Sequence, residues 1–238
     1  MVREISAFPI SHDQLNVAGV SEVRRSISML PGSPICLNPG AIAADICTHL
    51  NPLPIKGVIW LAGLPYIGDV LPIVATPLVL SFIPGITAPE SPAHALQSRI
   101  EFCKTLVAPE RLSSVPFAEL SSWVGAASFL LPQQGALALG RKQDPVRLKE
   151  EGAKGLPLCI IHGKADLQIT GANVVEEMEP HFKDCEVNLL DGIGHSPFWE
   201  APGAVADIIL KFVARVNHHE VGKTQVVFLA ERTDIGAV

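Results

Sequence analysis

Between residues 156 and 216 the chain alternates two strand patterns with two helix patterns, and this order constrains the fold more than any other feature. The apolar run LPLCIIHG at 156–163 is typical of a strand buried on both faces, and CEVNLLDG at 185–192 alternates before an Asp-Gly turn. Helical patterns follow these strands, at 172–182 and at 201–216. Successive strands joined through a helix pair in parallel, with a right-handed crossover. We therefore expect an α/β fold with a parallel sheet.

Further elements precede this unit. Residues 41–50 follow a Pro-Gly turn, are rich in alanine and repeat apolar residues three and four apart, which predicts a helix. The apolar run at 53–63, bounded by proline and glycine, predicts another buried strand. From residue 64 to about 152 no buried-strand pattern occurs, so we interpret this stretch as a helical insertion. Its expected helical pieces cover 91–107, 117–130, 133–141 and 144–151.

Charge and cysteine content disfavour several classes of protein. The formal net charge is −6 and no cluster of Lys and Arg exceeds two neighbours, so we expect no nucleic-acid partner. The cysteines are odd in number and form no Cys-x-x-Cys pair, which disfavours a disulfide framework and a zinc site. The N-terminal residues do not resemble a secretory signal, and a reducing cytoplasm is the expected location. The cysteines are Cys36, Cys47, Cys103, Cys159 and Cys185.

Residues 70–86 carry no charge and approach the length of a membrane-spanning helix. They also contain Pro72, Pro77 and Pro84, which are expected to interrupt a regular helix every turn or two. We therefore expect a lid or the lining of a pocket here, and no membrane association.

Two residues with catalytic chemistry follow the strands of the C-terminal unit. Asp166 comes just after the strand at 156–163, and His195 comes just after the strand at 185–192, in the stretch DGIGHSPFWEAP. Parallel sheets place functional residues beyond the carboxyl ends of their strands. The separation of 29 residues (195 − 166) is one helix plus one strand, so the two side chains are expected to meet at one edge. A carboxylate that accepts from Nδ1 fixes the tautomer of an imidazole and prepares it as a base.

This unit resembles the C-terminal half of the α/β-hydrolase fold, in its esterase and epoxide-hydrolase-like branch. The family pattern has a strand, His-Gly, two residues and the acid, then a helix and a strand, then Gly-His-Ser-Pro, a Glu-x-Pro step and the last helix. LPLCIIHGKADLQI and the stretch FKDCEVNLLDGIGHSPFWEAPGAVADIILKFV match it. LPIKGVIWLAG resembles the strand after the family's nucleophile turn, and the helical stretch 65–150 corresponds to the family's cap. The resemblance implies a three-layer α/β/α sandwich with a helical cap.

The resemblance also implies roles for single residues. His195 corresponds to the family's catalytic base and Asp166 to its orienting acid. Asp69 is an alternative acid, because some relatives place the acid beyond that earlier strand. His162, at the end of the strand 156–163, is expected to be a packing and hydrogen-bonding residue. The pair His218–His219 is expected to be solvated in the tail.

The family also needs a nucleophile on a Gly-x-Ser-x-Gly elbow just before the helix at 41–50, and the sequence there is SPICLNPGAIAAD. Alignment on the elbow's second glycine places Asn38, or with a shift of one residue Leu37, at the nucleophile position, and neither can attack a carbonyl. Ser33 and Cys36 are nearby but out of register. The nucleophile is therefore not identified from the sequence.

The first half of the fold is also short, with 32 residues before Ser33 and no His-Gly oxyanion loop among them. Three explanations are open: a shortened or mis-joined gene product, a pseudoenzyme that binds an apolar ligand, or an enzyme with an unorthodox nucleophile. Lost central strands would expose a sheet edge, through which the chain could form an oligomer. We divide the chain into a shortened N-terminal part of the core (1–64), a helical cap (65–152), the C-terminal part of the core (153–216) and a tail (217–238).

The resemblance implies hydrolysis of an ester or similar bond in a small apolar molecule. Serine-type acyl transfer would use His195 and Asp166 as base and acid, without metal or cofactor. The alternative is a non-catalytic protein that binds an apolar ligand in the cap pocket. The sequence does not identify the substrate.

Overall fold

The computed structural model describes residues 39–53, 55–88, 91–129, 136 and 140–218 of the 238-residue chain. The described strands form one parallel sheet in the order β1-β2-β3. These strands are β1 (Val58–Leu61), β2 (Leu158–Gly163) and β3 (Cys185–Leu190). The parallel pairing expected from the strand–helix order is confirmed.

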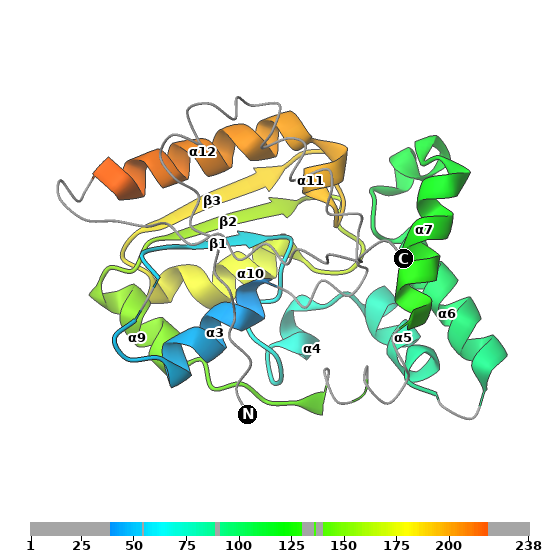
Figure 1. Ribbon diagram of the computed structural model, residues 1–238, viewed down its shortest axis with the longest axis horizontal. Coiled ribbons are helices and arrows are strands. Elements are labelled where there is room, and N and C mark those ends of the chain that lie inside the picture. Colours follow the sequence, from blue (N-terminus) through cyan, green and yellow to red (C-terminus); the bar gives the residue numbers. More distant parts are fainter. Residues whose placement is uncertain (1–38, 54, 89–90, 130–135, 137–139, 219–238) are drawn as a thin grey trace, which may run out of the picture.

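Helices cover both faces of the sheet, which gives the three layers that the sequence predicts (Figure 1). One face carries α12 (Pro202–His218), which follows the short helix α11 (Pro197–Glu200). The other face carries three helices that pack on β1, β2, β3 or each other. These helices are α3 (Pro39–His49), α9 (Val146–Lys154) and α10 (Gly171–Met178).

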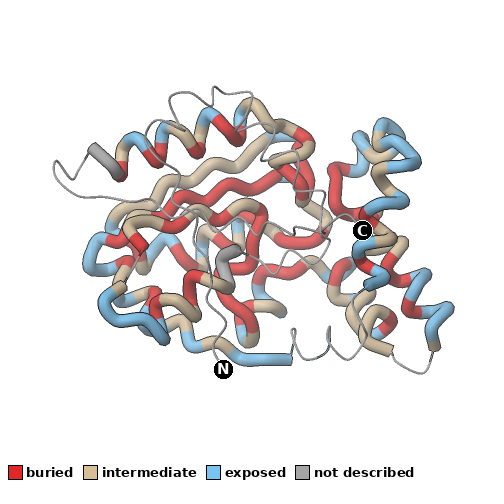
Figure 2. The backbone as a smooth tube through the Cα atoms, in the orientation of Figure 1, coloured by how far each residue is buried: buried red, intermediate tan, exposed pale blue. Residues whose placement is uncertain are grey.

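Side chains of β2 alternate between two apolar clusters, because successive residues of a strand point to opposite faces. Leu158 and Ile160 belong to the cluster on the side of α3, α9 and α10, together with the fully buried Trp60 of β1. Cys159 and Ile161 pack instead with the apolar residues of α12. Figure 2 shows β2 as buried along its length, as expected for a central strand between two helical layers.

The strand expected at 53–63 is shorter than predicted and covers only Val58–Leu61. Ala62, which follows it, has a φ of 52°, a left-handed conformation that ends the extended backbone. The other elements of the core begin and end within a few residues of their expected bounds. The last helix runs to His218, and His219 with the rest of the tail lies outside the described residues.

The insertion forms a group of helices beside the sandwich (Figure 1). α6 packs on α5 and on α7, and a 3-10 turn at Pro109–Ser114 joins α6 to α7. The helices are α5 (Pro77–Ile86), α6 (Pro92–Lys104) and α7 (Phe117–Phe129). The two ends of the segment 65–152 pack on helices of the sandwich. α4 (Leu71–Val74) packs on α10, and α9 packs on α3. The domain boundaries remain a prediction, and most of the helical piece expected at 133–141 lies outside the described residues.

The segment 70–86 forms two helices, α4 and α5, with extended backbone at Ala75 and Thr76 between them, so a single regular helix is interrupted before Pro77 as predicted. Pro72 and Pro77 lie in the first turns of α4 and α5, where a missing N–H does no harm. Pro84 lies inside α5 near its end, so the expectation that it interrupts a helix is wrong. No helix of the described residues is long and apolar enough to cross a membrane.

Candidate active site

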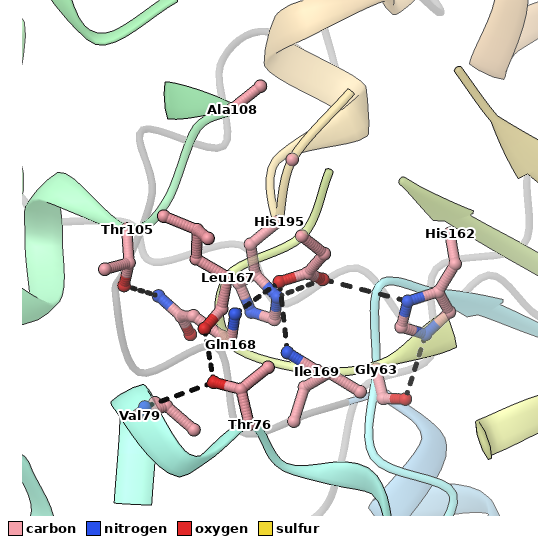
Figure 3. Close-up of polar contacts among 12 residues, drawn as sticks. Gly63, Thr76, Val79, Thr105, Ala108, His162, Leu167, Gln168, Ile169 and His195 are labelled. Atoms are coloured by element: carbon pink, nitrogen blue, oxygen red, sulfur yellow. Dashed lines mark hydrogen bonds and ion pairs between the residues drawn. The ribbon is translucent and has the colours of Figure 1, made fainter. Parts of the chain in front are cut away.

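Asp166 and His195 meet at the carboxyl edge of the sheet, where the loops after β2 and β3 lie side by side (Figure 3). His195 Nδ1 lies 2.9 Å from Asp166 Oδ2. The Asp166 side chain is only 1% exposed, whereas that of His195 is 21% exposed. Main-chain hydrogen bonds join the two loops, from Lys164 to Leu190 and from Ala165 to Ile193. The contact expected from the spacing of 29 residues is present.

The second carboxylate oxygen of Asp166 is held by its own loop. Oδ1 accepts the backbone N–H groups of Gln168 at 2.7 Å and Ile169 at 3.0 Å. The loop is fixed in turn to the helical insertion, because Thr76 Oγ1 donates to the carbonyl of Leu167 and Gln168 Nε2 donates to Thr105 Oγ1. These bonds hold the carboxylate of Asp166 toward His195, and Figure 3 shows His195 with the labelled residues Gln168 and Ile169 of this network.

This arrangement assigns the tautomer of His195. A carboxylate oxygen with no proton can only accept, so the Nδ1 atom of a neutral His195 must carry the proton. Nε2 on the other side of the ring is then left with a free lone pair. A partly exposed imidazole of this kind can take a proton from a hydroxyl group and return it to a leaving group.

His162 also lies beside Asp166, but its burial and its hydrogen bonds differ from those of His195. Its side chain is fully buried at the end of β2, and Nε2 donates to the carbonyl of Gly63 at 3.3 Å. Nδ1 is 3.8 Å from Asp166 Oδ2, too far for a hydrogen bond, and has no other partner. Burial lowers the pKa of His162 to about 4, although Asp166 acts in the opposite direction. The neutral ring packs and bonds at the strand end, as the sequence predicts.

Asp69, the alternative acid, is engaged elsewhere. Its side chain is 83% exposed and pairs with Lys142 at 2.8 Å. Asp166 is the carboxylate that bonds to His195.

The nucleophile candidates Ser33 and Cys36 lie outside the described residues, as do Leu37 and Asn38 at the elbow position. Within the described part of the chain, no hydroxyl or thiol group is hydrogen-bonded to Nε2 of His195. The four described cysteines are free thiols, and burial raises the pKa of each to about 11 or about 12. A thiolate at any of them is disfavoured, which removes them as nucleophiles. They are Cys47, Cys103, Cys159 and Cys185.

Among the residues that the structure describes, no three His, Cys, Asp or Glu side chains are arranged so that they could hold a metal ion.

The buried carboxylate of Glu200 lies beside the pair of Asp166 and His195, and the sequence shows Glu200 only as part of the Glu-x-Pro step. The side chain of Glu200 is 0% exposed, and its carboxylate accepts the N–H of Gly194 at 2.8 Å and that of Ala108 at 2.9 Å. Gly194 is the residue just before His195. The sequence did carry a signal, a single acidic residue between PFW and Ala-Pro, but it shows no sign of a partner as distant as Ala108.

Comparison with solved structures finds the same architecture in hydrolytic enzymes. The chain superimposes on an esterase from Rhodococcus sp. ECU1013 with a TM-score of 0.64 and 18% identity, over 74% of this chain and 62% of that one. For an esterase from Thermogutta terrifontis the TM-score is 0.54 at 17% identity, over 74% and 62%. For MGS-M2, an alpha/beta hydrolase enzyme from a Medee basin deep-sea metagenome library, the values are 0.50 and 13%, over 80% and 64%.

The chain thus spans a little over three fifths of the length of these structures. Neither a protein-family model nor a curated protein matches the sequence. At such low identity the likeness concerns the fold.

Proposed function

From the α/β-hydrolase fold that this chain adopts, we propose that it hydrolyses an ester or similar bond in a small apolar molecule. The observation that carries the proposal is the hydrogen bond between His195 Nδ1 and the buried carboxylate of Asp166. His195 acts as the base that removes a proton from an attacking serine hydroxyl. The serine oxygen bonds to the acyl carbon, the bond to the alcohol breaks, and His195 gives its proton to the leaving alcohol. A water that His195 deprotonates then cleaves the acyl-serine and restores the serine hydroxyl.

The role of Asp166 follows from its burial and its partners. Its carboxylate keeps Nδ1 protonated, so Nε2 is always the basic atom, and its negative charge stabilises the imidazolium that forms during attack. Asp166 does not itself exchange a proton. The two backbone N–H groups on Oδ1 keep the carboxylate in place throughout the reaction.

The substrate class and location are parts of the same proposal. An acyl group of modest size and low polarity suits the uncharged stretch 70–86, from which α4 and α5 form. The free thiols of the described cysteines fit a reducing cytoplasm. Self-association through a sheet edge remains a prediction, which light scattering of the purified chain would test.

A second function is favoured by one feature of the sequence, namely that no Gly-x-Ser-x-Gly elbow precedes α3. In that case the chain binds an apolar ligand in the same site and does not turn it over. Tight binding of a small ester that is recovered intact would support this alternative.

Hydrolysis of short p-nitrophenyl esters by the purified chain tests the proposal. We expect release of p-nitrophenol that is lost in His195→Ala and kept in His94→Ala, in which an exposed histidine is removed instead. Asp69→Asn serves in the same way as the control for Asp166→Asn, because Asp69 is exposed and pairs with Lys142. Release of p-nitrophenol that survives His195→Ala would contradict the proposed mechanism.

A further inference from the structure

Glu200 belongs to α11, a helix of only four residues directly after the His195 loop. Two neighbouring side chains of this helix connect the loop to the helical insertion. The ring of Trp199 meets that of Trp123 in α7 edge to face, with centroids 5.6 Å apart. The side chain of Glu200 has no exposure to solvent.

The Glu200 carboxylate bridges two backbone segments that are far apart in the sequence. One oxygen accepts from Gly194 and the other from Ala108, which follows α6. These segments touch, since a Cβ atom on Gly194 would lie 2.3 Å from the nitrogen of Ala108 and 2.5 Å from the carbonyl carbon of Val107. A glycine is therefore required before His195, and the carboxylate spans the contact.

Arg111 closes this arrangement from the solvent side. Its Nη1 donates to the backbone carbonyl of Glu200 at 2.9 Å, and its Nε lies 3.9 Å from Oε2. A buried carboxylate is costly unless hydrogen bonds and charge compensate for the lost water. Two backbone donors, one on each oxygen, suit a carboxylate, whereas an amide offers one acceptor and one donor. The site therefore selects an acidic residue for its shape and for its two acceptors.

We propose that Glu200 is a positioning residue, which holds the backbone of Gly194 against Ala108 and thereby keeps His195 in bonding distance of Asp166. The consequence for catalysis rests on the proposed function, whereas the consequence for the geometry of His195 does not. The insertion and the base then move as one body, because the same carboxylate is bound to both.

The test compares Glu200→Gln with Glu150→Gln, which changes an exposed glutamate of α9. Chains labelled with ¹⁵N-histidine are observed by NMR without substrate, after circular dichroism has shown that they are folded. In the wild type we expect His195 as the Nδ1–H tautomer, with an Nδ1 proton that exchanges slowly. In Glu200→Gln this proton exchanges rapidly and the tautomer becomes mixed, because the new NH₂ group faces one of the two N–H donors. Glu150→Gln leaves the spectrum unchanged.

The second readout is p-nitrophenyl ester hydrolysis. We expect kcat to fall about 10- to 100-fold in Glu200→Gln, since small displacements of a catalytic group have effects of this size, with KM changed less than about twofold. A mixed tautomer in a chain whose wild type hydrolyses nothing would support the positioning role and refute the proposed function. A wild-type His195 signal in folded Glu200→Gln would overturn the positioning role, whatever the activity.

If Glu200→Gln does not fold, Arg111→Ala tests the positioning role of Glu200 instead. This change removes a half-exposed side chain that supports the same carboxylate, so the fold is expected to tolerate it. Faster exchange of the His195 Nδ1 proton in Arg111→Ala would support the proposal, and exchange at the wild-type rate would overturn it.

Discussion

The end of β2 and the loop after β3 each present a histidine to the same carboxylate, and only one of them is suited to catalysis. His162 ends a strand that is buried between two helical layers, and its ring is neutral and closed to solvent. His195 stands in a loop, bonds to Asp166 at 2.9 Å and keeps one ring nitrogen available. The difference lies in the backbone, because a strand end fixes its side chain inside the core whereas a loop can present one at the surface.

The largest effect is expected for His195→Ala. Loss of the base should lower kcat for ester hydrolysis by up to roughly 10⁶-fold, the size seen when a triad histidine is removed. Because the ring is partly exposed, the thermal midpoint should change little. Steady-state kinetics beside His94→Ala would check this, and a similar loss of activity in both variants would show that the effect is not specific to His195.

Asp166→Asn should have the next largest effect, a loss of about 10⁴-fold in kcat. The asparagine would occupy the same space, but its NH₂ group can donate to Nδ1 and stabilise the wrong tautomer of His195. The measurement is kcat for the same ester, with Asp69→Asn as the exposed control. Equal activity of Asp166→Asn and wild type would show that Asp166 does not orient His195 for catalysis.

The burial of His162 should make the free energy of unfolding depend on pH. Its pKa is lowered from 6.5 to about 4 by burial, so the unfolded chain takes up a proton at a pH where the folded chain does not. The stability that a neutral His162 contributes is therefore complete above about pH 6.5 and is lost as the pH falls toward 4. By linkage the loss amounts to about 3 kcal/mol in the free energy of unfolding.

Urea unfolding between pH 7 and pH 4 measures this loss. His162→Gln, whose amide can still donate to Gly63, should lose less stability over this range than the wild type. His94→Gln should follow the wild-type curve. Parallel curves for wild type and His162→Gln would mean that the buried ring is not kept neutral by the fold.

The smallest effect concerns the contact between the end of β2 and the loop after β3. A Cβ atom on Gly163, the last residue of β2, would lie 2.1 Å from the carbonyl oxygen of Ile193, so Gly163→Ala should destabilise the fold by about 1–3 kcal/mol. Gly125→Ala in α7 meets no atom within 4 Å and should raise the stability by up to about 1 kcal/mol. Thermal unfolding of both would check the contrast, and equal midpoints would contradict it.

The sequence predicted the parts of this site that depend on local pattern. Buried-strand runs with a helix between them determine parallel neighbours, and the positions of Asp166 and His195 just beyond those strands determine that they meet. His162 could be placed for the same reason. These inferences need only the period of the strand and the handedness of the crossover.

The remaining features depend on contacts between distant segments. Glu200 bonds to Ala108, 92 residues earlier, and no local pattern shows that their backbones approach. The packing of α9 on α3 is of the same kind, since its apolar face is compatible with either the core or the insertion. Pro84 also lies inside α5, against its propensity, because a proline near a helix end removes few hydrogen bonds.

The central claim is that His195, oriented by Asp166, activates a nucleophile in this chain. Labelling of the purified protein with a fluorophosphonate probe, followed by peptide mass mapping, tests it most directly. We expect that one serine is labelled in the wild type, that the label is lost in His195→Ala, and that it is kept in His94→Ala. A folded wild-type chain that takes up no label, or a label that persists in His195→Ala, would contradict the claim.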